Sequence, residues 1–158
     1  MSGLIGGAGS KSGVIKRPSS FQARGEAGWA AISQYDIVPF DDVSTGDCFD
    51  VGGDYNTTDK KYTAPFAGRY WFFFNCYTAQ NDTNNGFTFK KNGTLVNLND
   101  SSSNELSFGP EGDSGDIIQH GGVPMTLAGG DYIQVCTAHA SDFHGSYSAW
   151  GGFYIMEA

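Results

Sequence analysis

The chain is 158 residues long, with 23 glycines, 15% aromatic residues and only 16% charged residues, and its formal net charge is −8. This acidity disfavours binding to nucleic-acid phosphates and adsorption to an anionic membrane, and no apolar run approaches the roughly 20 residues that span a bilayer. The length fits one domain, or one domain with a tail. Abundant glycine and aromatic residues favour short strands joined by tight turns, so we expect very little helix.

Residues 1–20 are rich in glycine and serine, and we expect them to form a flexible N-terminal arm in front of a domain spanning residues 21–158. Alone, such a segment cannot bury enough surface to offset an ordering cost of about 1–2 kcal/mol per residue. Two interpretations stay open: a disordered leader, or an anchoring arm that becomes ordered only against a partner. The anchoring residues in the second interpretation are Leu4, Ile5, Lys11, Val14 and Ile15. Two glycines follow Ile5 where a secretory signal would continue its apolar core, so we expect the chain to fold in a cytoplasm.

Short strand-like runs alternate with turn signals through the rest of the chain. We expect strands at 21–23, 35–38, 61–64, 68–77, 86–91, 94–97, 116–125, 131–138 and 147–156. The strongest local signal is Asn92-Gly93, because these residue types supply the positive φ angles of a type I′ turn between antiparallel strands. Strands of this number and spacing predict an all-β sandwich or barrel.

The run at 68–77, GRYWFFFNCY, is apolar on both sides. A strand with one face on a core and the other in water alternates apolar with polar residues. Here one side carries Tyr70, Phe72, Phe74 and Cys76, and the other side carries Trp71, Phe73, Asn75 and Tyr77. The C-terminal run 153–156 repeats this pattern. Both faces of these two strands are therefore expected to be buried.

Several motifs occur in an order that resembles the C1q/TNF-like family. The stretch 54–72 contains Thr63-Ala64-Pro65 followed by Gly68, Tyr70 and Phe72, which is similar to the family's Thr-Ala-Pro and Gly-x-Tyr-x-Phe motif. Further similar segments are the opening strand at 21–24, the Lys-Asn-Gly hairpin at 90–93, the Leu-x-x-Gly-Asp step at 125–133 and the closing strand at 149–155. The resemblance covers residues 21–158 and implies a jelly-roll sandwich of about ten antiparallel strands.

The resemblance also implies a homotrimer, because the inner sheets of such domains pack around a threefold axis. The two-sided strands would then place one face in the sandwich core and the other against sister subunits, whereas the mixed run 132–137 would belong to the outer sheet. The candidate trimer-interface residues are Tyr70, Trp71, Phe72, Phe73, Tyr77, Phe153, Tyr154 and Ile155. The alternative is burial of both faces within one domain, under a long loop.

Three groups of residues have the chemistry of metal ligands. His139, Asp142 and His144 lie in one loop, but their spacing matches no closed transition-metal site. Acidic residues cluster at 41–54, as Asp41, Asp42, Asp47, Asp50 and Asp54, and again at 111–116. Carboxylates suit Ca²⁺, and some C1q-like trimers hold calcium near their axis, but neither run matches an EF-hand loop. We therefore expect solvated loops and no cofactor, with calcium as the alternative.

The three cysteines, Cys48, Cys76 and Cys136, are too few for a disulfide framework, and two of them lie in apolar runs typical of buried free thiols. A catalytic site needs converging acids, bases or nucleophiles, and nothing near Cys48 would activate its thiol. The sequence therefore predicts a protein that is not an enzyme.

Three functions fit this combination of features. The first is a trimeric structural protein of a bacteriophage virion, assembled in the bacterial cytoplasm, which decorates the capsid or caps a fibre and docks on a capsid or tail protein through its N-terminal arm. The second is a module that binds a host receptor or glycan, for which the candidate stacking residues are Tyr55, Phe108, Phe143 and Tyr147. The alternative for each of these aromatic residues, and the one we favour, is packing within the fold. The third is a microbial signalling or spore-surface protein with the same fold.

Overall fold

The computed structural model describes residues 19–26, 28–79, 86–97 and 117–157. The described residues form thirteen strands and one short 3-10 helix. The strands are β1 (Ser20–Gly25), β2 (Trp29–Ile32), β3 (Phe40–Asp42), β4 (Phe49–Val51), β5 (Tyr55–Asn56), β6 (Lys61–Thr63), β7 (Gly68–Thr78), β8 (Phe87–Lys91), β9 (Thr94–Leu95), β10 (Ile117–Leu127), β11 (Tyr132–Thr137), β12 (Ser141–His144) and β13 (Ala149–Met156). The helix, η1, spans Gly145–Tyr147.

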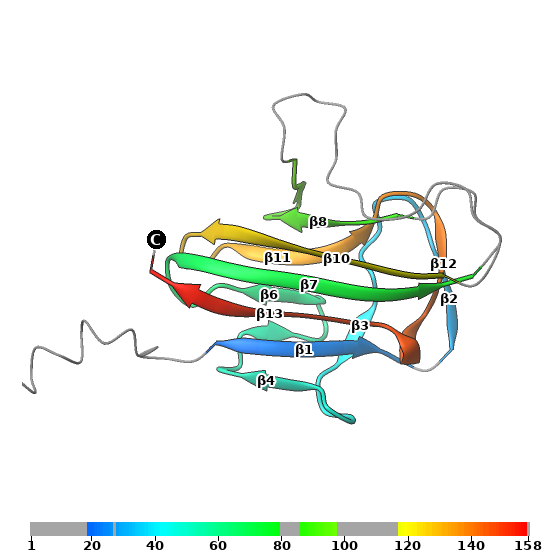
Figure 1. Ribbon diagram of the computed structural model, residues 1–158, viewed down its shortest axis with the longest axis horizontal. Coiled ribbons are helices and arrows are strands. Elements are labelled where there is room, and N and C mark those ends of the chain that lie inside the picture. Colours follow the sequence, from blue (N-terminus) through cyan, green and yellow to red (C-terminus); the bar gives the residue numbers. More distant parts are fainter. Residues whose placement is uncertain (1–18, 27, 80–85, 98–116, 158) are drawn as a thin grey trace, which may run out of the picture.

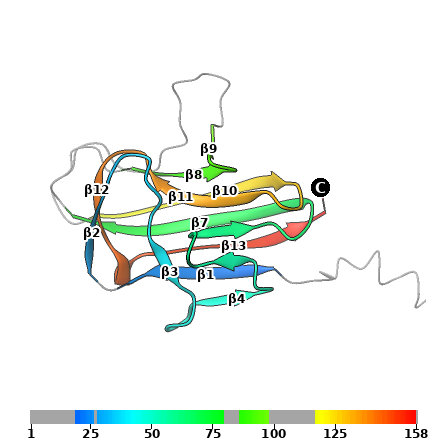
Figure 2. The same cartoon turned by 180° about the vertical axis from the view of Figure 1, so that it is seen from behind.

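The strands form two antiparallel sheets that lie face to face (Figures 1 and 2). The larger sheet has eight strands in the order β2-β12-β7-β13-β1-β3, with β10 paired to β7 and β4 paired to β1. The smaller sheet has the order β5-β6-β11-β8-β9. This arrangement confirms the all-β jelly-roll sandwich, and it confirms that the run 132–137 lies in the sheet that does not contain β7.

Aromatic side chains from both sheets fill the space between them. Phe21 of β1 stacks on Tyr55 and Tyr62, with ring centroids 4.8 and 4.9 Å away, and it meets Trp150 edge-on at 4.6 Å. Buried phenol and indole groups need hydrogen-bond partners. Here the Tyr55 hydroxyl donates to the Phe40 carbonyl at 2.5 Å and accepts from Trp150 Nε1 at 3.2 Å. At this point, apolar groups fill the core, and its buried polar atoms have hydrogen-bond partners.

The predicted Asn92-Gly93 turn is confirmed. Asn92 and Gly93 have φ angles of 52° and 81°, and they connect β8 to β9. The Asn92 amide donates to Asp131 Oδ1 at 2.8 Å and accepts from the Tyr132 N–H at 2.9 Å. Lys91 Nζ lies 2.9 Å from Asp131 Oδ2. These contacts join the hairpin to the turn before β11 and fix the register of the smaller sheet.

Most of the expected strands agree with the structure to within a few residues, and the expected scarcity of helix also agrees. The segment 35–38 differs, because it forms one bridge, between Ile37 and Cys136, beside the edge of β11. The short strands β2, β3, β4, β5 and β12 were not predicted. Each has two to four residues, which is too short for alternation to be read from the sequence.

The described fold begins at Ser19, whose side chain is 3% exposed. The Ser19 hydroxyl donates to Asp54 Oδ2 at 2.7 Å and also bonds to the Tyr62 hydroxyl. The expected anchoring residues Leu4, Ile5, Lys11, Val14 and Ile15 lie outside the described residues, so the arm and its boundary remain predictions. β1 begins, and β13 ends, at the same end of the sandwich, whereas β2 and β12 lie at the opposite end (Figure 1).

A candidate interaction face on the larger sheet

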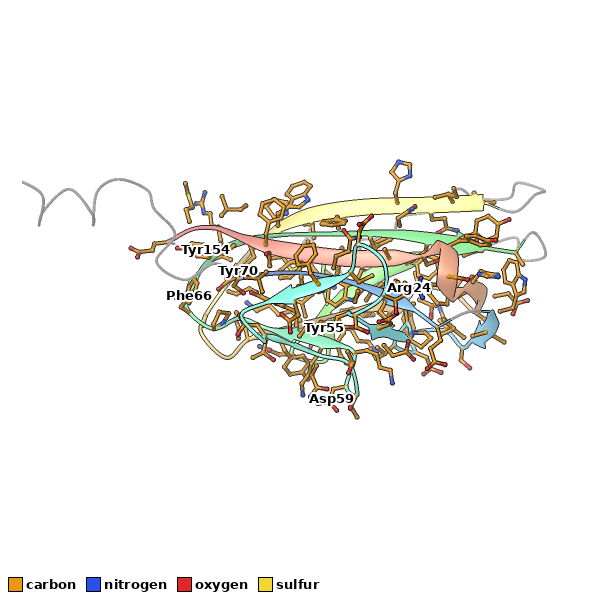
Figure 3. The ribbon with its side chains drawn as sticks, turned by 90° about the horizontal axis from the view of Figure 1, so that it is seen from below. Arg24, Tyr55, Asp59, Phe66, Tyr70 and Tyr154 are labelled. Atoms are coloured by element: carbon orange, nitrogen blue, oxygen red, sulfur yellow. The ribbon has the colours of Figure 1, made fainter. Side chains whose placement is uncertain are left out.

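The inward side of β7 forms the middle of the sandwich core. Tyr70, Phe72, Phe74 and Cys76 are at most 1% exposed. Tyr154 of β13 is 9% exposed, and it meets Tyr70 edge-on at 5.4 Å and Phe66 edge-on at 4.7 Å (Figure 3). The expectation that Tyr70, Phe72 and Tyr154 lie at a trimer interface is therefore wrong, because these side chains are covered within a single chain.

The outward side of β7 carries Trp71 and Phe73, both partly exposed. The register of the sheet places Trp71 between Phe153 of β13 and Pro124 of β10. It places Phe73 between Gly151 of β13 and Gly122 of β10. Cross-strand neighbours on one face of an antiparallel sheet are in contact range. Trp71 and its two neighbours therefore form one row across the strands, and Phe73 and its two glycine neighbours form the next row.

The two glycines lie beneath the aromatic rings. A Cβ atom at Gly122 would lie 2.9 Å from Trp71 Cζ2, and a Cβ atom at Gly151 would lie 2.8 Å from Phe73 Cζ. Both distances are shorter than ordinary contacts, so larger residues would push the rings outward. The glycines therefore let both rings lie close to the backbone of the neighbouring strands.

Beyond β13 the two rows pass through Ser20 and Gln22 of β1 and then reach apolar residues of β4. Ser20 pairs with Phe153 and with Val51, and Gln22 pairs with Gly151 and with Phe49. Phe49 is 41% exposed, Val51 42% and Phe153 45%. We name this surface the apolar stripe, and its members are Phe49, Val51, Trp71, Phe73, Gly122, Pro124, Gly151 and Phe153. Ile155 and Met156 extend it beyond the bulge of β13, with 41% and 51% of their surfaces exposed.

Next to the apolar stripe, a row with the polar residues Arg24, Asn75 and His120 crosses the same strands. Arg24 pairs with Ala149, and Asn75 pairs with Ala149 and His120. Arg24 Nε lies 3.0 Å from Asp42 Oδ2 (Arg24 is labelled in Figure 3). Hydrogen bonds from Thr45 and Ser44, together with Arg24, hold the pKa of Asp42 well below its usual range. The polar row therefore separates the apolar stripe from Tyr77 and its partner Ile118, at the far end of β7.

Of the candidate interface residues, Trp71, Phe73, Tyr77, Phe153 and Ile155 lie on the outward side of the larger sheet, and their contact with another subunit remains a prediction. The sequence interpretation missed Phe49, Val51, Pro124 and the two glycines, Gly122 and Gly151. The two glycines carried a signal that strand patterning ignores: a glycine inside a strand marks a place where another group approaches the backbone closely.

The acidic residues of the 41–54 loop act as hydrogen-bond acceptors for its turns. Asp42 Oδ1 accepts from the Ser44 and Thr45 N–H groups at 2.8 and 3.1 Å. The Asp50 carboxylate accepts from the Asp54 and Tyr55 N–H groups, both at 3.2 Å. Within the described ranges, no three His, Cys, Asp or Glu side chains come together as a group that could hold a metal ion. The acidic run 111–116 lies outside these ranges.

The cysteines are free, with Cys76 and Cys136 buried and Cys48 partly buried. Burial raises the pKa of the Cys76 thiol well above its usual value. Burial, and then the nearby Asp42 carboxylate, raise the pKa of the Cys48 thiol as well. Because the thiolate is the reactive form, both shifts make these thiols poor nucleophiles.

Two of the four aromatic residues that are candidates to stack on sugars are in the core. Tyr55 is 7% exposed and Phe143 is 1% exposed, so these two side chains pack in the core, as expected for them in preference to sugar contact (Tyr55 is labelled in Figure 3). Phe108 lies outside the described residues. Tyr147 of η1 is 64% exposed and is therefore available for contact.

In the described part of the chain, no helix has the length and apolar character needed to cross a bilayer.

Comparison with solved structures supports the fold. The globular domain of the zebrafish complement 1qA protein is similar with a TM-score of 0.58 and 20% identity, over 89% of this chain and 99% of that chain. The Eiger TNF from S. frugiperda has a TM-score of 0.63 and 12% identity, over 90% and 96%. Murine APRIL has a TM-score of 0.60 and 11% identity, over 87% and 99%. No protein-family model and no curated protein matches the sequence. At these identities, the likeness shows that the chain has a C1q/TNF-type jelly-roll fold.

Proposed function

We propose that the protein is a homotrimer whose subunits contact one another through the apolar stripe. The observation that supports this proposal is the exposure of Phe49, Val51 and Phe153 beside the partly exposed rings of Trp71 and Phe73. Large exposed apolar side chains gathered on one face are rare on soluble monomers and common at interfaces between subunits. The number of copies follows from the resemblance to C1q/TNF-like domains, whose inner sheets pack around a threefold axis.

Sedimentation equilibrium of the purified chain at micromolar concentration tests the assembly. The expected species has three times the 16.9 kDa mass of one chain. A single species of 16.9 kDa at this concentration would refute the trimer, and a stable dimer would refute the threefold arrangement while leaving the stripe as an interface.

Within this proposal, the trimer is a non-enzymatic structural component of a bacteriophage virion, as a capsid decoration or the head of a fibre. Free cysteines mean that the described fold needs no oxidising compartment, which suits assembly in a bacterial cytoplasm. β1 begins at the same end of the sandwich at which β13 ends (Figure 1), so an anchoring arm before β1 would attach this end and project the other.

Deletion of residues 1–17 tests the anchoring role, because the described fold begins only at Ser19. The truncated chain should still form the trimer, but it should no longer bind particles that lack the protein, in a co-sedimentation assay with the full-length chain as control. Undiminished attachment of the truncated chain would refute the arm, and absence of the protein from purified virions would refute the virion role itself.

A second candidate function is recognition of a receptor or glycan by the end of the sandwich opposite the start of β1 and the end of β13 (Figure 1). The observation that favours it is the exposure of Tyr147, together with other aromatic side chains around it. A glycan array probed with the purified protein tests this function, because saturable signals on defined sugars would support it and a uniformly negative array would contradict it.

A further inference from the structure

Four aromatic side chains gather on the outer surface where β2, β7, β12 and η1 meet. We name them the aromatic cluster: Trp29, Tyr77, His144 and Tyr147. The His144 ring lies at the centre, stacked on Tyr147 at 4.5 Å and edge-on to Trp29 at 4.8 Å. Tyr77 lies 5.7 Å from Trp29 and 5.4 Å from Tyr147. The polar row of Asn75 and His120 separates the cluster from the apolar stripe.

The cluster is exposed but firmly positioned. Trp29 is 51% exposed and Tyr147 is 64% exposed. Trp29 pairs with His144 across β2 and β12, and the Gly145 N–H donates to the Gly28 carbonyl at 3.0 Å. The Ser148 hydroxyl donates to the His144 carbonyl at 2.8 Å and accepts from the Tyr77 N–H at 2.8 Å. A surface held in this way loses little conformational entropy when a ligand binds.

The surroundings of the cluster favour a small, uncharged ligand. β2 has the sequence WAAI, β12 has SDFH and η1 has GSY, so these elements contain one acidic residue, Asp142, and no lysine or arginine. Together with the net charge of −8, this disfavours phosphates, sulfates and acidic sugars. Ala31, the next residue on the same face of β2 as Trp29, is small and exposed, so no large side chain of β2 covers the Trp29 ring.

We propose that the aromatic cluster binds a neutral pyranose unit of a glycan. The C–H groups on one face of such a sugar carry partial positive charge, and the negative face of the exposed Trp29 ring attracts them. The His144 ring lies at 85° to Trp29 and at 28° to Tyr147, so the Tyr147 ring is inclined to Trp29 and contacts the side of the sugar. The hydroxyl groups at the rim of the sugar meet polar atoms beside the rings, namely the Ser146 hydroxyl and the His144 imidazole, which lie 3.4 Å apart. Small-molecule sites commonly combine apolar area with a few polar atoms in this way. The inference deepens the second candidate function and does not depend on the trimer.

Titration with neutral hexose and N-acetylhexosamine oligosaccharides tests the proposal, with the heat of binding as the signal for every variant and tryptophan emission as a second signal for the chains that keep Trp29. Trp150 is fully buried, so a change on binding reports on the two more exposed tryptophans, Trp29 and Trp71. The Trp29→Ala and Tyr147→Ala variants should each weaken binding of the best sugar at least tenfold, whereas Tyr147→Phe should stay within threefold of the natural chain. The Phe153→Ser variant should bind sugar normally even if it no longer forms trimers, and this control separates failure of the site from failure of the assembly.

Several outcomes would overturn the proposal. These are the absence of saturable binding to any neutral sugar, equal affinity of the two alanine variants and the natural chain, and preferential binding of sialylated sugars or of tetramethylammonium. If Trp29→Ala or Tyr147→Ala instead abolishes the trimer while the thermal unfolding of the chain is unchanged, a second copy of the chain covers the cluster and the sugar site is wrong.

Discussion

Replacement of Phe153 by serine should weaken the trimer strongly while leaving the fold of each subunit intact. Phe153 is 45% exposed in the single chain, opposite Trp71 on one side and Ser20 on the other. For an aromatic side chain of about 200 Å², this leaves roughly 90 Å² to be buried on association, which at ~25 cal/mol per Å² contributes about 2 kcal/mol per subunit. The three copies together contribute about 6 kcal/mol to the trimer, or roughly four orders of magnitude in its dissociation constant.

The dissociation constant of a trimer has units of concentration squared, so the concentration at which half of the chains are assembled varies as the square root of this constant. A change of four orders of magnitude in the constant should therefore raise that midpoint concentration about a hundredfold. Mass photometry and sedimentation equilibrium over a dilution series measure this midpoint. The Tyr147→Ser variant is the matched control, because Tyr147 is also an exposed aromatic residue but lies outside the apolar stripe. A midpoint for Phe153→Ser within threefold of the natural chain, with both proteins equally resistant to heat, would refute the stripe as the interface.

Three further predictions concern the fold that supports this face. Tyr62→Phe removes the hydroxyl that bonds to Ser19 in the core and should lower the free energy of unfolding by about 1–3 kcal/mol in urea denaturation, with no change in the pattern of the circular dichroism spectrum. Hydrogen bonds from Asn92 and Lys91 lower the pKa of Asp131 from 3.8 to about 2, so the stabilisation by its carboxylate is present above pH 4 and is lost as the pH falls from about 4 to 2. The Asp131→Asn variant should therefore lose less thermal stability than the natural chain over this interval. An unchanged pH profile of its thermal stability would contradict the role given to Asp131. Gly151→Ala should destabilise the fold by about 1–3 kcal/mol, because its Cβ would lie 2.6 Å from the Phe21 carbonyl oxygen; a stability equal to that of the natural chain would mean that the strands separate easily at this point.

The sequence was sufficient for the fold because its long strands carry redundant signals. β7 and β13 combine aromatic composition, alternation and flanking turns, and Asn92-Gly93 specifies its turn by local backbone preference alone. The short strands β2 and β12 have no comparable signal. They form by pairing with each other, as at Trp29 and His144, although they are far apart in the sequence. The strand propensities of neighbouring residues do not indicate a pairing between such distant segments.

The candidate face was predicted only in part, for a similar reason. Alternation along β7 separates Tyr70 and Phe72 from Trp71 and Phe73, but composition alone does not say which of the two sides faces the other sheet. Phe49 and Val51 join the stripe through the pairing of β4 with β1, and Pro124 joins it through the pairing of β10 with β7. Each of these pairings joins segments well separated in the sequence, so the full extent of the face depends on tertiary structure.

The strict alternation along β7 has a consequence for how this protein diverges from its relatives. Tyr70 and Phe72 contribute to subunit stability and Trp71 to the outer surface, so substitutions can accumulate outside without loosening the interior. Gly151 is the exception, since an added methyl group would meet both Phe73 and the β1 backbone. A lineage that acquires new neighbours should therefore vary at Trp71 and Phe153 first and keep this glycine longest.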